Sequence, residues 1–250
     1  PLTGWRHMAH PSANLLYGNQ AIFDTVSGKL YDIYIDAKQV IAFDTNARSW
    51  SNPWKDTLLT EFWHANKFSS AKDSSIYIIG GYGQLKYKNG VQRYHWPTQK
   101  WEVLKVSGDH FAPRYLAALG LSITGDTAFI IGGYGSPEGD QMLNPGNYYD
   151  LYAFDIARRS FKRLHSITTG DPHYLFANSL VIDPSGKNYY ALRFPNGSFN
   201  TQLQLISGKL EDSTYRLVGD KIPYSFYDVQ TFADLFYSPD SKKLFAVTFH

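Results

Sequence analysis

Two short segments of this chain repeat one another. Residues 77–83 read YIIGGYG and residues 129–135 read FIIGGYG, so their glycine pairs, Gly80-Gly81 and Gly132-Gly133, are 52 residues apart. An apolar run that ends in two glycines and recurs at roughly 50 residues is typical of folds built from repeated four-stranded sheets. The repeat predicts an all-β architecture before any residue is examined for chemistry.

A second regularity is an aromatic residue expected in the last strand of each unit, at intervals of 51, 60 and 54 residues. These positions are Trp50, Trp101, Phe161 and Tyr215. In the first three units another aromatic residue stands seven positions earlier. Pairs with a strong turn preference, such as Ser27-Gly28, separate the expected strands. The pattern predicts the blades of a β-propeller.

The expected blades cover residues 15–53, 62–106, 114–167 and 173–218, and a partial blade covers 224–250. We expect residues 1–250 to form one propeller domain, or one segment of a larger propeller. The alternative is a ring of five blades in which the two chain ends, including Gly4-Trp5-Arg6, share a blade and remove the open sheet edge.

The complete motif Gly80-Gly81, Tyr94 and Trp101 resembles the repeat of the kelch superfamily, and the resemblance extends over about residues 15–218. It implies a kelch-type β-propeller, a scaffold that carries many functions. The galactose-oxidase-like proteins are similar in this repeat. Their copper site requires a tyrosine cross-linked to a cysteine, and this chain has no cysteine, so the resemblance implies their fold without their redox chemistry.

The composition excludes several function classes. The net charge is only +2, from 24 basic and 22 acidic residues, which argues against nucleic acid as a partner. No apolar run approaches the roughly 18 residues that span a bilayer, so we expect no direct membrane insertion. The absence of cysteine excludes disulfides and thiolate metal sites and fits a periplasmic or extracellular location. Because the chain starts at Pro1, we expect that a targeting segment has been removed.

Two long loops, residues 82–90 and 134–149, follow the glycine pairs. Because both leave the same strand of adjacent blades, we expect them to project from one face, and long loops often carry function. The functional interpretation is a shared binding rim formed by Tyr82, Lys86, Tyr87, Tyr134, Glu138 and Asp140. The alternatives are two solvated connections, or tyrosines at 82 and 134 that pack on the glycine pairs as structural residues.

The segments that start the innermost strands form a second candidate set. They place aromatic side chains beside cationic or neutral donors, a combination suited to a sugar or a carboxylate near the channel mouth. The residues are Trp63, His64, Arg114, Tyr115, His173 and Tyr174. The alternative is that the aromatic rings pack between blades and that the histidines and the arginine cap the strands.

Signals for catalysis are weak. The histidines have no metal-ligand spacing, and neither a GxSxG motif nor a phosphate-binding loop is present, so we predict no metal and no cofactor and lean against an enzyme. The predicted function is a non-catalytic binding or sensing module that presents loops to a protein or glycan, within a larger extracytoplasmic protein. The alternatives are an isomerase- or lyase-type enzyme acting on a sugar or small metabolite, and a structural scaffold. Convergence of His64, Arg114 and His173 with a carboxylate would favour the enzyme.

Overall fold

The computed structural model describes residues 19–24, 28–34, 38–51, 62–168, 170–171 and 173–249. Within these ranges every regular element is a β-strand except one short 3-10 turn, η2 (Asp228–Gln230), which confirms the all-β prediction. The chain forms two compact units, residues 1–60 and 61–250. The prediction of a single propeller domain therefore stays a prediction.

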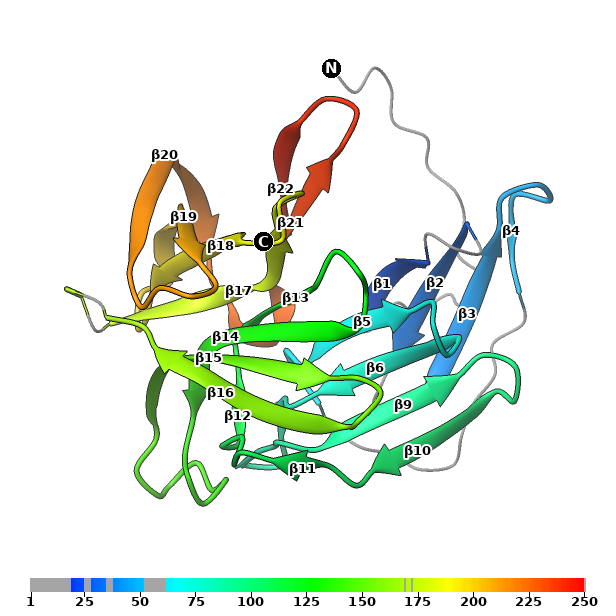
Figure 1. Ribbon diagram of the computed structural model, residues 1–250, viewed down its shortest axis with the longest axis horizontal. Helices are drawn as coiled ribbons and strands as arrows, with labels where there is room; N and C mark the ends of the chain where they lie inside the picture. The colour runs from blue at the N-terminus through cyan, green and yellow to red at the C-terminus, as the bar shows by residue number, and fades with distance from the viewer. Residues whose placement is uncertain are drawn as a thin grey trace. The chain divides into compact units, whose positions relative to one another are not determined.

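The first unit contains one antiparallel sheet whose strands follow one another in sequence order (Figure 1). Its strands are β1 (Asn19–Asp24), β2 (Lys29–Tyr34), β3 (Gln39–Asp44) and β4 (Ser49–Trp50). Gly28 lies between β1 and β2 with a φ of 66°, a conformation that favours glycine. Ser27, the other residue of the predicted turn, lies outside the described residues, as do Ile35-Asp36, which stand in place of a glycine pair in this blade, and Gly4-Trp5-Arg6.

Within its described residues the second unit contains one further four-stranded sheet, one ten-stranded sheet and two strand pairs (Figure 1). Its strands are β5 (Asn66–Ser70), β6 (Ser75–Ile79), β7 (Tyr82–Gly83), β8 (Lys86–Tyr87), β9 (Val91–His95), β10 (Lys100–Leu104), β11 (Ser107–Gly108), β12 (Arg114–Tyr115), β13 (Ala118–Leu121), β14 (Thr127–Gly135), β15 (Gly146–Asp155), β16 (Ser160–Ser166), β17 (Tyr174–Ile182), β18 (Asn188–Pro195), β19 (Asn200–Lys209), β20 (Tyr215–Ser225), β21 (Phe232–Ser238) and β22 (Lys243–Phe249).

Strands β5, β6, β9 and β10 form one sheet of the second unit, and β13–β16 and β17–β20 form the next two antiparallel meanders. The first strands of these two meanders, β13 and β17, pair in parallel where Leu119 meets Ser179, so the two meanders belong to one continuous sheet. No sheet closes on itself within the described residues.

Buried side chains fill the space between successive sheets of the second unit. One apolar cluster joins β5–β10 to β13–β16, for example through Tyr77 and Phe154. A second joins β13–β16 to β17–β20, and a third joins β17–β20 to the pair β21–β22. Each cluster therefore draws residues from neighbouring groups of strands, and burying these large aromatic and aliphatic groups is the main stabilising contribution.

The predicted last-strand aromatic residues lie in the fourth strand of each sheet. Trp50 stands opposite Phe43, Trp101 opposite Tyr94 and Phe161 opposite Phe154. Seven residues is the spacing of two directly paired positions in such a hairpin, so the aromatic pairs are cross-strand contacts.

Tyr215 differs from these aromatic residues because its partner in the pairing is Gly208. A side chain at Gly208 would collide with the ring of Tyr189, which comes from β18. The ring that contacts Tyr215 is instead that of Tyr174, from β17, at a centroid distance of 6.2 Å.

Candidate functional site

The two glycine pairs lie against the short strand β12. Gly80 and Gly132 have φ values of 70° and 68°, where residues with a side chain are strained. A Cβ at Gly80 would lie 2.8 Å from the carbonyl oxygen of Arg114, and one at Gly133 would lie 2.9 Å from that of Tyr115. The glycines thus allow β12 to approach both strand ends, from which the two long loops depart.

The two loops, which belong to neighbouring sheets, are bonded to each other. The amide of Tyr87 donates to the carbonyl of Gly139 at 2.7 Å, and the amide of Gln141 donates to the carbonyl of Leu85 at 3.3 Å. Lys86 and Asp140 form a β-bridge, and the Tyr82 hydroxyl donates to the Gln141 side chain. We call residues 82–88 and 136–143 the loop platform.

Five aromatic side chains, two of them from the loop platform itself, pack together. We call them the aromatic cluster: Trp63, Tyr82, Tyr87, Tyr115 and Tyr134. Ring centroids are 5.3 Å apart between Tyr82 and Tyr115, 5.7 Å between Tyr87 and Tyr115 and 5.9 Å between Tyr87 and Tyr134. The amide of Trp63 also donates to the Tyr82 carbonyl at 2.8 Å. The structure therefore joins residues of both predicted candidate sets in one place.

Two phenols of the aromatic cluster, those of Tyr87 and Tyr115, stay protonated. Burial raises the pKa of Tyr87 to about 12, and the neighbouring Tyr134 and Tyr82 add to the effect. Burial also raises the pKa of Tyr115, with a further contribution from the Asp228 carboxylate. At neutral pH these hydroxyls donate and accept hydrogen bonds and do not serve as bases.

His64 is buried beside the aromatic cluster. Its Nε2 lies 2.8 Å from the backbone oxygen of Asp228, and its ring packs 5.0 Å from that of Phe232. Burial lowers the pKa of this imidazole, and the bond to Asp228 opposes the shift. The neutral ring then donates its Nε2–H and ties the start of the second unit to η2.

Arg114 is 2% exposed and is held by internal partners. Its guanidinium forms a salt bridge with Asp150 and donates to the carbonyl of Gly132 at 3.1 Å, and it stacks 4.0 Å from the ring of Tyr148. Its charge is neutralised by Asp150 of β15, and these contacts stabilise β12. A role of Arg114 in binding a ligand stays a prediction.

The other predicted residues are dispersed. His173 is exposed, while Tyr174 is buried and packs on Tyr149 with a centroid distance of 4.8 Å. Lys86 and Glu138 are exposed on the loop platform, and the half-buried Asp140 accepts a hydrogen bond from its own loop at 2.8 Å.

The residues whose convergence would favour an enzyme, His64, Arg114 and His173, have different partners and surroundings. In the described ranges no group of three or more His, Asp or Glu side chains could hold a metal ion. Nor do these ranges contain a helix that is long and apolar enough to cross a membrane.

Two known proteins with kelch motifs are similar in sequence to about half of this chain. A Xenopus laevis protein described as "Rab9 effector protein with kelch motifs" is 27% identical over 129 residues, which is 52% of this chain and 33% of that protein. The Bos taurus protein of the same description is 26% identical over 116 residues, 46% of this chain and 30% of that protein. This chain resembles kelch-motif proteins. No protein-family model matches it.

The similarity confirms the kelch resemblance expected from the glycine pairs, at low identity and over about a third of the length of these relatives. The names of both relatives refer to another protein, Rab9, and neither names a glycan.

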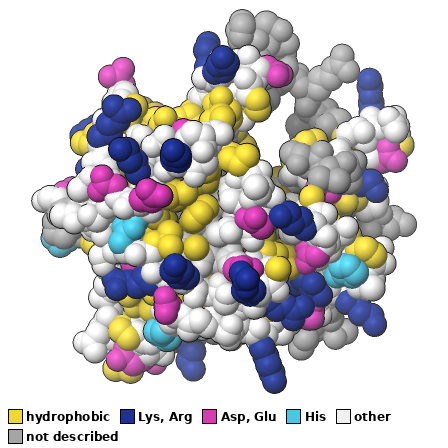
Figure 2. Space-filling model, viewed as in Figure 1, with side chains coloured by type: hydrophobic (Ala, Val, Ile, Leu, Met, Phe, Trp, Pro, Cys, Tyr) yellow, Lys and Arg dark blue, Asp and Glu magenta, His cyan; other side chains and the backbone are white. Residues whose placement is uncertain are grey.

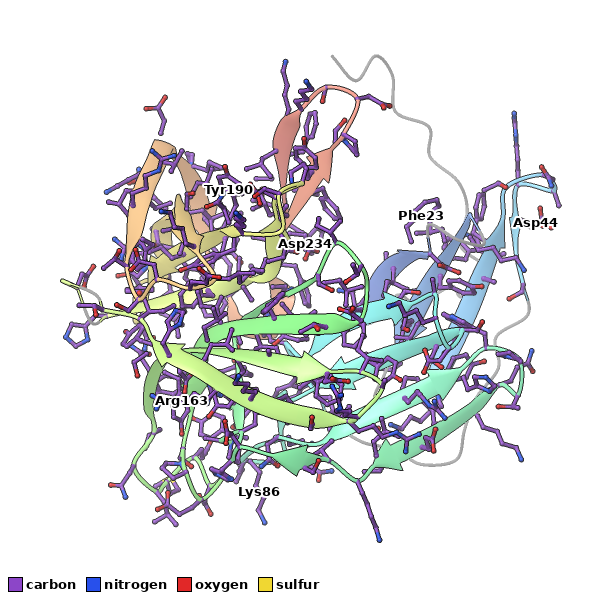
Figure 3. The ribbon with its side chains drawn as sticks, viewed as in Figure 1. Phe23, Asp44, Lys86, Arg163, Tyr190 and Asp234 are labelled. Carbon is purple, nitrogen blue, oxygen red and sulfur yellow. The ribbon has the colours of Figure 1, made fainter. Side chains whose placement is uncertain are left out.

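The sequence analysis missed three apolar residues at the tip of this kelch-like chain's loop platform. Leu85 is 64% exposed, Met142 is 79% exposed and Leu143 is 48% exposed. Lys86, the neighbour of Leu85, lies at the lower edge of the view in Figure 3, and hydrophobic side chains gather at the lower left of Figure 2, over the loop that follows β14. The sequence does contain a signal for these residues, because they are apolar residues within two otherwise polar loops.

Proposed function

We propose that this chain is a protein-binding module that docks a partner on the loop platform, with Leu85, Met142 and Leu143 as the central contacts. The observation that carries the proposal is the exposure of these three apolar side chains on two loops that are bonded to each other. Clustered exposed apolar groups with a polar rim are characteristic of protein interfaces.

The backbone bonds between the loops favour tight binding. Loops that are already ordered lose little conformational freedom when a partner docks, so more of the contact energy appears as affinity. The aromatic cluster also holds the platform in place, because Tyr82 and Tyr87 of the platform pack on the rings of Trp63 and Tyr115.

The rim of the platform favours a protein over a strongly charged ligand. Lys86 and Lys88 contribute two positive charges, and Glu138 and Asp140 contribute two negative charges, so neither sign dominates. The names of the relatives supply one concrete partner, Rab9, and we propose it as the first to test.

The test is a binding titration of immobilised chain with purified Rab9 by biolayer interferometry. The double variant Leu85→Asp/Met142→Asp should weaken binding by about 10- to 100-fold, because each substitution buries a charge at the centre of the interface. Val103→Asp is the matched control, since Val103 is equally exposed but lies on β10. Equal affinities for both variants would refute the platform, and absence of Rab9 binding would refute Rab9 as the partner.

We also propose that the sheets are successive blades of a kelch-type β-propeller, with β5, β13, β17 and β21 as the innermost strands. The parallel contact of β13 with β17 and the apolar clusters shared by successive sheets support this arrangement. A cryo-electron microscopy or crystal structure of the protein in its native source would count the blades, and an open stack of sheets without an axial channel would contradict the proposal.

The extracytoplasmic location expected from the lack of cysteine remains a proposal. Fractionation of the source cells with an antibody against the chain tests it. Recovery of the protein with a cytosolic marker would reject it.

A further inference from the structure

A cleft of about 540 Å³ lies on the sheet β17–β20, and no residue of the loop platform lines it. Its walls come from β18, β19 and β20, from the first residue of β17 and from the segment that precedes it. Arg193 of β18 lines the cleft, with a side chain that is only 15% exposed.

The guanidinium of Arg193 is poorly satisfied by the protein. Nη1 donates to the Tyr215 hydroxyl at 3.0 Å and lies 4.0 Å from the Asp171 carboxylate, and the ring of Tyr174 lies 4.5 Å from the guanidinium carbon. A guanidinium has five N–H donors, and within the described part of the chain its Nε and Nη2 have no hydrogen-bonding protein partner. A largely buried cation with free donors favours an anion in the cleft.

The charges around the cleft favour a singly charged anion. Lys221 adds a second cation, and Asp171 adds a carboxylate that is 61% exposed, so the three groups sum to +1. Figure 2 shows further Lys and Arg side chains over β19 and β20, at the upper left of the view. A carboxylate matches both this charge and the planar fork of the guanidinium, whereas a phosphate dianion is repelled more strongly by Asp171.

The apolar part of the lining favours a peptide. Leu217 is 54% exposed on the wall, which suits the side chain of a neighbouring apolar residue. Phe194 and Tyr174 line the cleft but are buried, so they offer no open aromatic face on which a sugar ring could stack.

We propose that this cleft binds the carboxylate side chain of an acidic peptide segment, with Arg193 as the anion contact and Leu217 as the seat of an adjacent apolar side chain. The site is separate from the loop platform and is independent of the proposed partner there.

The experiment is an NMR titration of the isotope-labelled 250-residue chain with a blocked hexapeptide that contains one glutamate followed by leucine. We expect the Arg193 Nε–H signal and the Leu217 amide signal to shift. The shifts should be half-saturated at a peptide concentration of about 1 mM, a weak affinity that suits a short peptide. The same peptide with glutamine in place of glutamate should leave both signals unchanged. Equal shifts with the two peptides, or none with either, would overturn the proposal.

Three variants sharpen the titration. Arg193→Gln should abolish the shifts, and Leu217→Ser should weaken binding. Asp171→Asn removes a repelling charge at an exposed position and should tighten binding by about two- to fivefold, so it tests the proposal even when Arg193→Gln does not fold. A phosphoserine peptide that binds more tightly than the glutamate peptide would assign the cleft to phosphate and reject the carboxylate. Leu85→Asp on the loop platform is the control, with an unchanged titration.

Discussion

The burial of His64 makes the stability of the chain depend on pH. Burial lowers the pKa of the folded imidazole below its unfolded value near 6.5. As the pH falls below about 6.5 the unfolded chain binds the proton first, so the free energy of unfolding falls with pH by at most about 1.4 kcal/mol per unit. Urea unfolding at pH 7.5 and 5.5 should show this loss, and His64→Gln should reduce it. The exposed His173→Gln should leave the pH dependence as it is, and an equal effect of both variants would contradict this origin.

The buried ion pair of Arg114 and Asp150 should contribute strongly to the free energy of unfolding. Removing one partner of a buried ion pair leaves an uncompensated charge, which costs about 3–5 kcal/mol. Arg114→Gln should therefore lower the free energy of unfolding by about that amount in urea denaturation. Arg158→Gln is the control, because its salt bridge with Asp155 is exposed, and it should cost less than about 1 kcal/mol. Adding Asp150→Asn to Arg114→Gln should cost less than the sum of the two, whereas full additivity would show that the pair does not interact.

At the scale of elements, Gly132 and Gly186 distinguish two costs of adding a side chain: strain of the backbone and overlap with neighbouring atoms. Gly132 and Gly186 have φ values of 68° and 72°, so Gly→Ala strains the backbone at both by about 1 kcal/mol. A Cβ at Gly132 would also lie 2.2 Å from the ring of Phe176, whereas Gly186 has open space. Gly132→Ala should cost about 1–3 kcal/mol more than Gly186→Ala in chemical denaturation, because the core is overpacked. Equal costs would show that the ring moves aside freely.

The elements that the sequence predicted were those whose residues recur at a fixed, short spacing along the chain. The hairpin of β9 and β10 places Tyr94 opposite Trp101, so short-range spacing was enough to find it. The burial of Arg114 was not predictable in this way, because its partner Asp150 lies on another strand 36 positions away. The platform contact of Leu85 with Gln141 likewise depends on two sheets coming together, which no local pattern records.

At the scale of the second unit, the apolar clusters couple its sheets. Phe176 is fully buried between β13–β16 and β17–β20, and a separate cluster links β13–β16 to β10 through Leu104. Phe176→Ala should destabilise the unit by about 3–5 kcal/mol. Because the clusters form a chain across successive sheets, we expect hydrogen exchange to accelerate in peptides from β10 as well as in those from β17. Phe199→Ala, at an exposed ring, should leave both rates nearly unchanged. Faster exchange confined to β17–β20 would mean that the sheets open independently, and the repeated units would then act as separate folding modules.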